Sequence, residues 1–559
     1  MDCVALFKRS LESYQQGRPA EASAVLREVL RLRPDHFDAL HLSAVIADQS
    51  GQTEQSAELL SRAIALNALV PAAHRNLGSA LVKLRRLEEA VACYDRAIAL
   101  RPDFAQAHCG RAGALVDLDR PSEAIESCRR VLELAPNSPD AYVFRGAALI
   151  AVNRPAQAIA SFDAALSLRP NDPLALNGRG SALNDLQQPE AAVENLQEAV
   201  ALAPAYAEAW NNLGIVRAEL GRHEEAQASF ERAISLTPGD ARPYLNAAHA
   251  CLQVGRFERG WELYEWRAKL SKAAAPPGPV SQPSWSGSED IEGKTLYLHS
   301  EQGLGDTIQF CRYARLAELR GARVVMSVQD GLVRLLSGLS PTIDIVGEGR
   351  APASFDFHCP LLSMPRAFGT RLETVPAGGP YLSAEPQRSE HWRRILGEDG
   401  LKVGICWQGA LTKVDIGRSF PLDSFRRLAT LPAVRLISLQ KRVGSEQLAS
   451  LPEGMKVETL GADFDAGADA FLDSAAVIAN LDLVVTSDTA IAHLAGALGR
   501  TTWVVLKHSP DWRWLLQRAD CPWYPSHRLF RQHRPGDWNA VFDEVYAALQ
   551  DFHFSRYRR

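Results

Sequence analysis

Residues of the same kind recur every 34 positions through the first half of this chain. Proline stands at six positions of one such grid, and Ala68 alone breaks the row: Pro34, Pro102, Pro136, Pro170, Pro204 and Pro238. Small residues occupy two further grids, and larger apolar residues, from Leu26 to Tyr264, occupy a fourth. A fixed period of this length is typical of stacked helical hairpins.

The grids predict how the two helices of each unit pack. Small residues such as Gly78, Gly146 and Gly180 allow two helices to approach closely, a large residue such as Phe162 fills the gap, and proline ends the second helix. We therefore predict about eight units over residues 1–270, which begin near Cys3, Phe37, Pro71, Ala105, Pro139, Pro173, Ala207 and Ala241.

These units resemble tetratricopeptide repeats. The resemblance implies an all-α superhelix whose first helices line a groove for extended peptides. Asn76, Asn212 and Asn246 share the sixth position of their units, and an asparagine there can pair with a peptide backbone through both its carbonyl and its NH₂. We predict that these three residues contact a bound peptide. The alternative is that asparagine is simply common at this position, whose row is interrupted by Gly110, Phe144 and Gly178.

The last unit departs from the pattern, because Arg267 and Lys272 replace the expected small residue and proline. We predict that it is a transition into the next domain rather than a free solvating cap. Residues 271–290 are rich in Pro, Ser and Gly, which predicts a semi-extended linker.

Short apolar runs alternate with helical stretches after the linker, which predicts parallel sheets flanked by helices. We expect strands over 295–299, 323–327, 403–407, 435–439, 483–486 and 502–506. Their grouping predicts two Rossmann-like α/β lobes, over 291–385 and 400–550.

Two polar turns lie where ligands of open α/β sheets bind, beyond the carboxyl ends of strands. Gly303, Gly305 and Asp306 follow the first strand, and glycine there lets backbone N–H groups approach an anion or a sugar hydroxyl. Asp488 and Thr489 follow another strand, with His493 one turn into the next helix. The alternatives are that the aspartates cap helices and that the histidine is a satisfied core residue.

The stretches G-L-G-D-T-I-Q-F and D-T-A-I-A-H-L-A-G-A-L-G resemble the two signature stretches of family 9 glycosyltransferases, the heptosyltransferase group. V-G-I-C-W-Q-G, with R-S-F-P after it, resembles the third segment of that group. The resemblance implies a two-lobed GT-B fold, a nucleotide-sugar donor held mainly by the C-terminal lobe, and metal-independent transfer with inversion.

The same resemblance implies that Asp306 is the general base, which the helix N-terminus would keep ionised. For the donor we predict contacts from Gly303, Gly305, Asp488, Thr489 and His493, with Arg418 as the clamp on the departing phosphate. Lys441 is a second clamp candidate, or else a solvated surface lysine. Trp512 is a candidate to cover a nucleobase, or else a core residue, and Arg513 a candidate to reach a phosphate.

Charge and cysteine usage exclude several classes. The net charge of −5 argues against a nucleic-acid binder. The nine cysteines are scattered without a C-x-x-C pair, so we expect reduced thiols and no zinc site. A D-x-D pair at Asp463 and Asp465 arises often by chance, and we predict no metal. Because no leader and no apolar run of 18 residues occurs, we expect a cytoplasmic protein without a membrane span.

A sugar transferase joined to a peptide-holding array predicts a protein acceptor, modified on Ser or Thr, with no cofactor beyond the nucleotide-sugar substrate. The layout is similar to that of O-GlcNAc transferases and of bacterial flagellin glycosyltransferases. One alternative is a glycan- or lipopolysaccharide-directed transferase whose repeats dock an assembly partner. The other is a non-catalytic scaffold, against which Asp306, Arg418 and Asp488 together argue. The motifs do not encode the sugar, the nucleotide or the acceptor.

Overall fold

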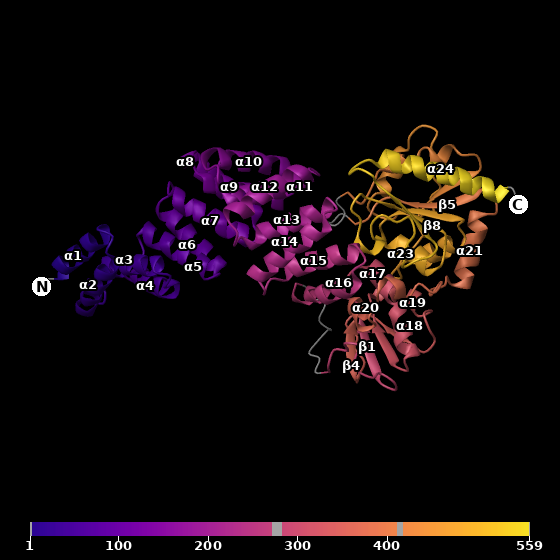
Figure 1. Ribbon diagram of the computed structural model, residues 1–559, viewed down its shortest axis with the longest axis horizontal. Helices are drawn as coiled ribbons and strands as arrows, with labels where there is room; N and C mark the ends of the chain where they lie inside the picture. Colours follow the sequence, from indigo (N-terminus) through magenta and orange to yellow (C-terminus); the bar gives the residue numbers. More distant parts are fainter. Residues whose placement is uncertain (1–2, 271–281, 411–416, 558–559) are drawn as a thin grey trace. The chain divides into compact units, whose positions relative to one another are not determined.

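The computed structural model describes residues 3–270, 282–410 and 417–557, which form two compact units, Met1–Leu220 and Gly221–Arg559. Lys272 and residues 271–281 of the predicted linker lie outside the described residues. The division does not fall at residue 270, where the repeats were expected to end. It falls inside the repeat array, because the last repeat packs on the α/β part (Figure 1).

The first unit is a series of helical hairpins in which every first helix begins at its predicted residue. This confirms the 34-residue register from Cys3 to Ala207. The helices are α1 (Cys3–Gln15), α2 (Pro19–Leu32), α3 (Phe37–Gln49), α4 (Thr53–Leu66), α5 (Pro71–Lys83), α6 (Leu87–Leu100), α7 (Ala105–Asp117), α8 (Pro121–Leu134), α9 (Pro139–Ala151), α10 (Pro155–Leu168), α11 (Pro173–Asp185), α12 (Pro189–Leu202) and α13 (Ala207–Glu219).

Aromatic rings seated against glycines hold neighbouring repeats together. A Cβ atom added to Gly146 or to Gly178 would lie 2.6 Å or 2.3 Å from the nearest carbon of the buried Phe162 ring. Tyr94 is enclosed in the same way by Gly78 and Gly110. The predicted packing of a large side chain between small residues is therefore confirmed, and it uses the glycine of the following repeat as well.

We expect Gly178→Ala to destabilise the first unit by about 1–2 kcal/mol, since overpacking of a core costs about 1–3 kcal/mol and the helix itself gains less than that from alanine. Phe162→Leu should also destabilise it, by leaving a gap. The double variant should lose less than the sum of the two single variants, because leucine makes room for the new methyl group. Urea unfolding followed by circular dichroism measures all three. Strict additivity would contradict this account of the packing.

The second unit begins with three further repeat helices, α14 (His223–Leu236), α15 (Ala241–Gln253) and α16 (Phe257–Tyr264), and the 3-10 helix η1 (Glu265–Lys269). A parallel sheet follows, with the strand order β3-β2-β1-β4. Its strands are β1 (Thr295–His299), β2 (Arg323–Ser327), β3 (Asp344–Val346) and β4 (Phe357–Pro360).

A second parallel sheet has the strand order β6-β5-β7-β8-β9. Its strands are β5 (Leu401–Cys406), β6 (Val434–Ser438), β7 (Leu483–Ser487), β8 (Thr502–Leu506) and β9 (His527–Arg531). The α-helices beside the two sheets are α17 (Leu304–Phe310), α18 (Arg312–Leu319), α19 (Val333–Leu336), α20 (Met364–Ala367), α21 (Pro386–Leu396), α22 (Leu472–Ala479), α23 (Ala490–Ala497) and α24 (Trp538–Tyr557). The predicted α/β class is confirmed.

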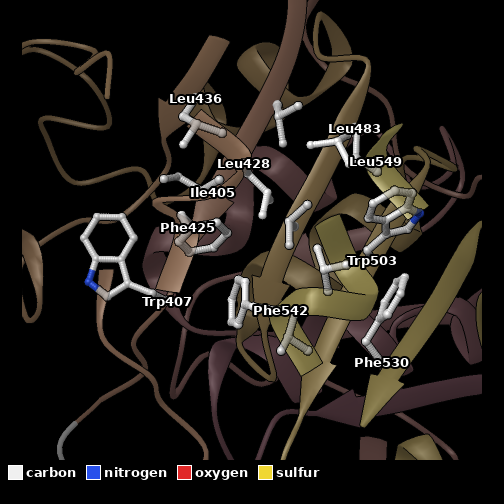
Figure 2. Close-up of a cluster of buried hydrophobic side chains, with 14 of the residues drawn as sticks. Ile405, Trp407, Phe425, Leu428, Leu436, Leu483, Trp503, Phe530, Phe542 and Leu549 are labelled. Atoms are coloured by element: carbon white, nitrogen blue, oxygen red, sulfur yellow. The ribbon is translucent and has the colours of Figure 1, made fainter. Parts of the chain in front are cut away.

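One face of the second sheet is covered by a dense aromatic and aliphatic core. Figure 2 shows side chains of β5, β7 and β8, among them Ile405, Leu483 and Trp503, facing Phe542 and Leu549 of α24. Burial of this apolar surface fixes the sheet. The carboxyl end of β7 is thereby held in place.

The last repeat is fixed to the α/β part by buried polar and aromatic contacts, which we call the joint. The Trp261 indole donates to the Thr370 carbonyl at 2.9 Å, and Gln253 donates to the Pro510 carbonyl at 2.7 Å. The buried Arg267 guanidinium donates to Glu301 at 2.7 Å and also to the Ser363 hydroxyl. The prediction that the last unit is a transition rather than a solvating cap is confirmed.

Candidate functional site

The turns after β1 and β7 meet because α17 packs against α23. Gly305 permits this approach, since a Cβ atom there would lie 3.0 Å from Cδ2 of His493 and 3.4 Å from Cα of Ala490. Gly303, by contrast, is exposed at the start of α17, and its N–H donates to Oδ2 of Asp306 at 2.9 Å. The two motifs, of which the first ends at Phe310 and the second begins at Asp488, thus form one region of the second unit.

Arg513 lies at the centre of a charged cluster, which we define as Asp306, Asp488, Asp511 and Arg513. Its Nη2 is 2.5 Å from Oδ1 of Asp306, and its Nη1 is 2.9 Å from Oδ1 of Asp511. The Arg513 side chain is 9% exposed, whereas those of Asp306 and Asp511 are 23% and 33% exposed. The cluster therefore has a buried side and a side that solvent or a ligand can reach.

The pKa of Asp488, the buried carboxyl of the cluster, is shifted in the opposite direction from that of Asp511. Burial and the nearby charge of Asp511 raise the pKa of Asp488 to about 6, against the opposing effect of Arg418. Burial would also raise the pKa of Asp511, but Arg513 holds it below its usual value. Arg513 itself has a raised pKa, because Asp511 and Asp306 outweigh the cost of burying its charge. The cluster combines fixed charges with one carboxyl that titrates near neutral pH.

His493 is buried behind the cluster. Its Nδ1 is 3.1 Å from the Tyr524 hydroxyl, and its ring stacks on Trp514 with centroids 5.4 Å apart. Burial, reinforced by the charge of Arg513, lowers its pKa well below the usual value, so the imidazole is neutral. Thr489 stands at the start of α23, with its hydroxyl 3.1 Å from that of Thr486.

Three buried polar atoms around the cluster have no hydrogen-bond partner among the described residues. They are Nε2 of Gln309, Oγ of Ser487 and Nε1 of Trp514. The Trp514 indole lies close enough to Asp488 to lower the pKa of that carboxyl, so Gln309 and Ser487 are the clearer cases. Gln309 also accepts from Nε of Arg513 at 2.8 Å. A buried polar group without a partner costs about 1–3 kcal/mol, so these atoms favour a polar ligand or water at this place.

Arg418 and Lys441, the two predicted phosphate clamps, have different surroundings. Arg418 lies near enough to Asp488 to lower the pKa of that carboxyl. Lys441 is exposed and donates to the Phe464 carbonyl.

Trp512 belongs to the joint rather than to an open surface. It is 3% exposed, and its ring lies against those of Trp261, Tyr264, Phe310 and Trp523. This burial contradicts the prediction that Trp512 covers a nucleobase, because almost none of its side chain is open to a ligand.

The D-x-D pair has a structural role at Asp465, which caps α22 by accepting from the backbone N–H groups of Asp473 and Ser474. Across the described residues no group of three or more His, Cys, Asp or Glu is placed to hold a metal ion.

The sixth position of the repeats is a contact between neighbouring repeats. The Asn76 amide lies 2.9 Å from Nε2 of His41, and the Asn212 amide donates to Oδ1 of Asn177 at 2.9 Å, each partner being 35 residues earlier. Phe144, at the same position, packs against Gly113. Asn76, Asn212 and Asn246 are half-buried. At Asn76 and Asn212 part of the hydrogen-bonding capacity predicted for a peptide is thus used within the array.

Asp511, Gln309 and Tyr264 were not among the predicted site residues. Asp511 directly precedes Trp512 and Arg513, which were predicted site residues. This neighbourhood in the sequence was the one feature that could have pointed to Asp511. Gln309 occupies a helical position with no sequence signature. The sequence period predicts Tyr264 as a core residue of its repeat, yet its hydroxyl also lies within hydrogen-bond distance of Gln302.

Models of the tetratricopeptide repeat match residues 13–69, 42–100, 75–139, 115–180 and 171–239. The first part of the chain is an array of tetratricopeptide repeats. Such an array is a protein-interaction scaffold. Within the described residues, no helix combines the length and the apolar character that crossing a membrane requires.

The chain is also similar to protein FlbA of Caulobacter vibrioides, with 30% identity over 317 residues, which is 52% of this chain and 52% of that protein. The chain thus spans about half the length of that relative. Among solved structures, a tetratricopeptide repeat protein from Parabacteroides merdae matches 44% of this chain and 97% of its own, at 16% identity and a TM-score of 0.38. The Cut9–Hcn1 hetero-tetramer of APC/C matches 46% of this chain and 52% of its own, at 17% identity and a TM-score of 0.38.

Proposed function

We propose that this protein is a glycosyltransferase that moves a sugar from a nucleotide-sugar donor to a protein held by its tetratricopeptide repeats. The observation that carries the proposal is the charged cluster. It brings Asp306, which follows a strand of the first sheet, to Arg513, which follows strand β8 of the second. Ligands of open α/β sheets bind at such strand ends. Two of the stretches that resemble family 9 glycosyltransferases contribute Asp306 and Asp488 to this cluster, whereas Asp511 and Arg513 lie outside them.

The chemistry assigns a distinct task to each group. The acceptor hydroxyl oxygen attacks the anomeric carbon, its proton passes to Asp306, and the bond from that carbon to the phosphate oxygen breaks with its electron pair leaving on the phosphate. Arg513 and Arg418 offer positive charge to the departing phosphate. Asp306 keeps acceptor capacity for the proton, because each carboxylate oxygen has two lone pairs and each accepts one hydrogen bond here.

The repeat array is the reason for proposing a protein acceptor. A scaffold that holds polypeptides would bring their hydroxyl groups to the same chain that activates the sugar. The argument rests on the combination of parts, because the charged cluster by itself does not distinguish a protein from a glycan.

A thermal-shift screen against UDP-, GDP-, ADP- and CMP-sugars tests donor binding. A donor at 100 times its Kd stabilises the folded state by about 2.7 kcal/mol, which raises Tm by a few degrees. We expect one nucleotide class to do so, and Arg513→Gln to lose the shift while Arg528→Gln, on strand β9, keeps it. No shift from any of the four classes would contradict the proposal.

Intact-mass measurement of candidate partner proteins, produced together with this chain, then tests the acceptor. We expect a mass gain of one or more sugar units on a protein. An altered glycolipid with no mass gain on any protein would instead support a glycan-directed transferase.

A further inference from the structure

The last repeat extends beside the charged cluster. Its first helix, α15, packs on η10 (Trp512–Trp514), and Gln253 near the end of α15 donates to the Ser509 hydroxyl at 3.2 Å as well as to Pro510. The residues that Gln253 anchors directly precede Asp511 of the cluster. The position of α15 relative to the cluster is therefore fixed by contacts inside one compact unit.

His249 lies one turn before this anchor on the same face of α15, because residues four apart in a helix are neighbours. Its side chain is exposed, and its ring tilts against Tyr264 with centroids 5.7 Å apart. Asp511 and Arg513 both act on its charge, with opposite signs. His249 is thus an exposed side chain of the repeat array that lies within electrostatic range of the charged cluster.

The environment keeps the His249 imidazole neutral. The side chain is exposed, yet the protein packed near it lowers its pKa, an effect that Asp511 opposes and Arg513 strengthens. A neutral imidazole has one nitrogen that accepts a hydrogen bond and one that donates. The His249 ring can therefore donate a hydrogen bond to a hydroxyl or peptide group, or accept one from it.

Tyr264 brings the second helix of the last repeat to the same place. Its hydroxyl lies 3.3 Å from Nε2 of Gln302, an exposed residue that directly precedes Gly303 and the turn to Asp306. Burial raises the pKa of Tyr264, and Asp306 adds to the shift, whereas Arg513 and Arg267 oppose it. The loop that carries the general base is consequently braced by the repeat array.

We propose that the last repeat forms the acceptor side of the site, and that His249 contacts the acceptor polypeptide next to the hydroxyl that receives the sugar. The proposal rests on the proposed function and adds the residue by which the array enters the reaction. Asn246 lies one turn further along α15, so the acceptor chain would continue from His249 along this helix into the array. The repeats then serve as part of the active site and as a recruiting surface.

The test compares His249→Ala and His249→Gln with His391→Ala in the full-length chain. His391, on α21, is a matched control, since it is also exposed and also stands against a ring, that of Trp392. Two rates are measured: the mass gain of the partner protein, and the release of nucleotide from the sugar donor without acceptor. We expect His249→Ala to lower the ratio of transfer to nucleotide release at least tenfold, mainly through KM for the protein. His249→Gln should recover part of the loss, because an amide retains a donor and an acceptor.

Each outcome has a separate meaning. An unchanged ratio in His249→Ala, or an equal fall in His391→Ala, overturns the role of His249 while the proposed function stands. A fall of both rates in parallel also overturns it, because the side chain would then serve the donor or the fold. If the unaltered protein neither releases nucleotide nor modifies a protein, the proposed function fails and this inference fails with it.

Discussion

Asp306→Asn is expected to lower the rate of sugar transfer by about 10²–10⁴-fold, the usual contribution of a general base. Asparagine has nearly the same shape, and its carbonyl oxygen can still accept from the Gly303 N–H, so α17 keeps its cap. Arg513 keeps Asp511 as a partner. Donor affinity should therefore stay within a few-fold of the unaltered protein, although the amide removes the ion pair with Arg513 as well as the capacity to accept a proton.

Asp356→Asn is the matched control for this experiment. Asp356 also accepts a backbone N–H, that of Thr295, at 2.8 Å, but it directly precedes β4 and contacts the first residue of β1, away from the carboxyl ends of the strands. The Asp356→Asn variant should transfer sugar at the rate of the unaltered protein. Single-turnover measurements with saturating donor separate the chemical step from binding. Undiminished turnover of Asp306→Asn would remove Asp306 as the base.

Deletion of residues 1–220 is expected to lower modification of a protein target by about 10²–10³-fold at micromolar target while donor hydrolysis stays measurable. Tethering a bound target near the site raises its local concentration to about the millimolar range, and the deletion removes that gain. The cut at Leu220 leaves the second compact unit whole, including α14, on which α15 packs.

A short peptide that carries the modified hydroxyl is the control substrate. The deletion should affect its modification far less, because a short segment gains little from the removed repeats. Addition of residues 1–220 as a separate chain should not restore modification of the protein, since the tether would be missing. Equal activity of both forms on the full-length target would refute a recruiting role for the first unit.

The repeat array was predictable to the residue because its information is periodic. The 34-residue grids fixed the start of every first helix from Cys3 to Ala241 and the seating of Phe162 against Gly146. The sixth-position asparagines were harder to interpret, because their partners His41 and Asn177 lie in the preceding repeat at a position without a distinctive residue type. A short polar side chain looks the same in the sequence whether it meets a ligand or a neighbouring repeat.

In the α/β part, the apolar runs predicted six strands, and the structure adds β3, β4 and β9. β3 and β4 are short and partly exposed, and β9 contains charged residues, so none gives a clear apolar run.

The candidate site was predictable only where residues follow a strand. Asp306 and Asp488 follow strands, whereas Asp511, Gln309 and His249 acquire their positions through tertiary packing. Trp512 shows the limit most clearly, since a tryptophan beside a charged residue can cover a ligand or, as here, fill a core between two parts of a chain.

The joint also has a consequence for how a chain of this kind can be rearranged. Phe257, Trp261 and Tyr264 belong to the repeats by sequence period, yet their rings complete the core of the α/β part. If the α/β part were separated from the repeats at the Pro-rich stretch, Trp512 and Trp523 would become exposed to solvent. The buried Glu301 would also lose its ion pair with Arg267. The segment that must be inherited as one piece with the α/β part therefore begins inside the repeat array. Recombination can lengthen or exchange the repeats before Gly221, while the final hairpin has to travel with the sheets it braces.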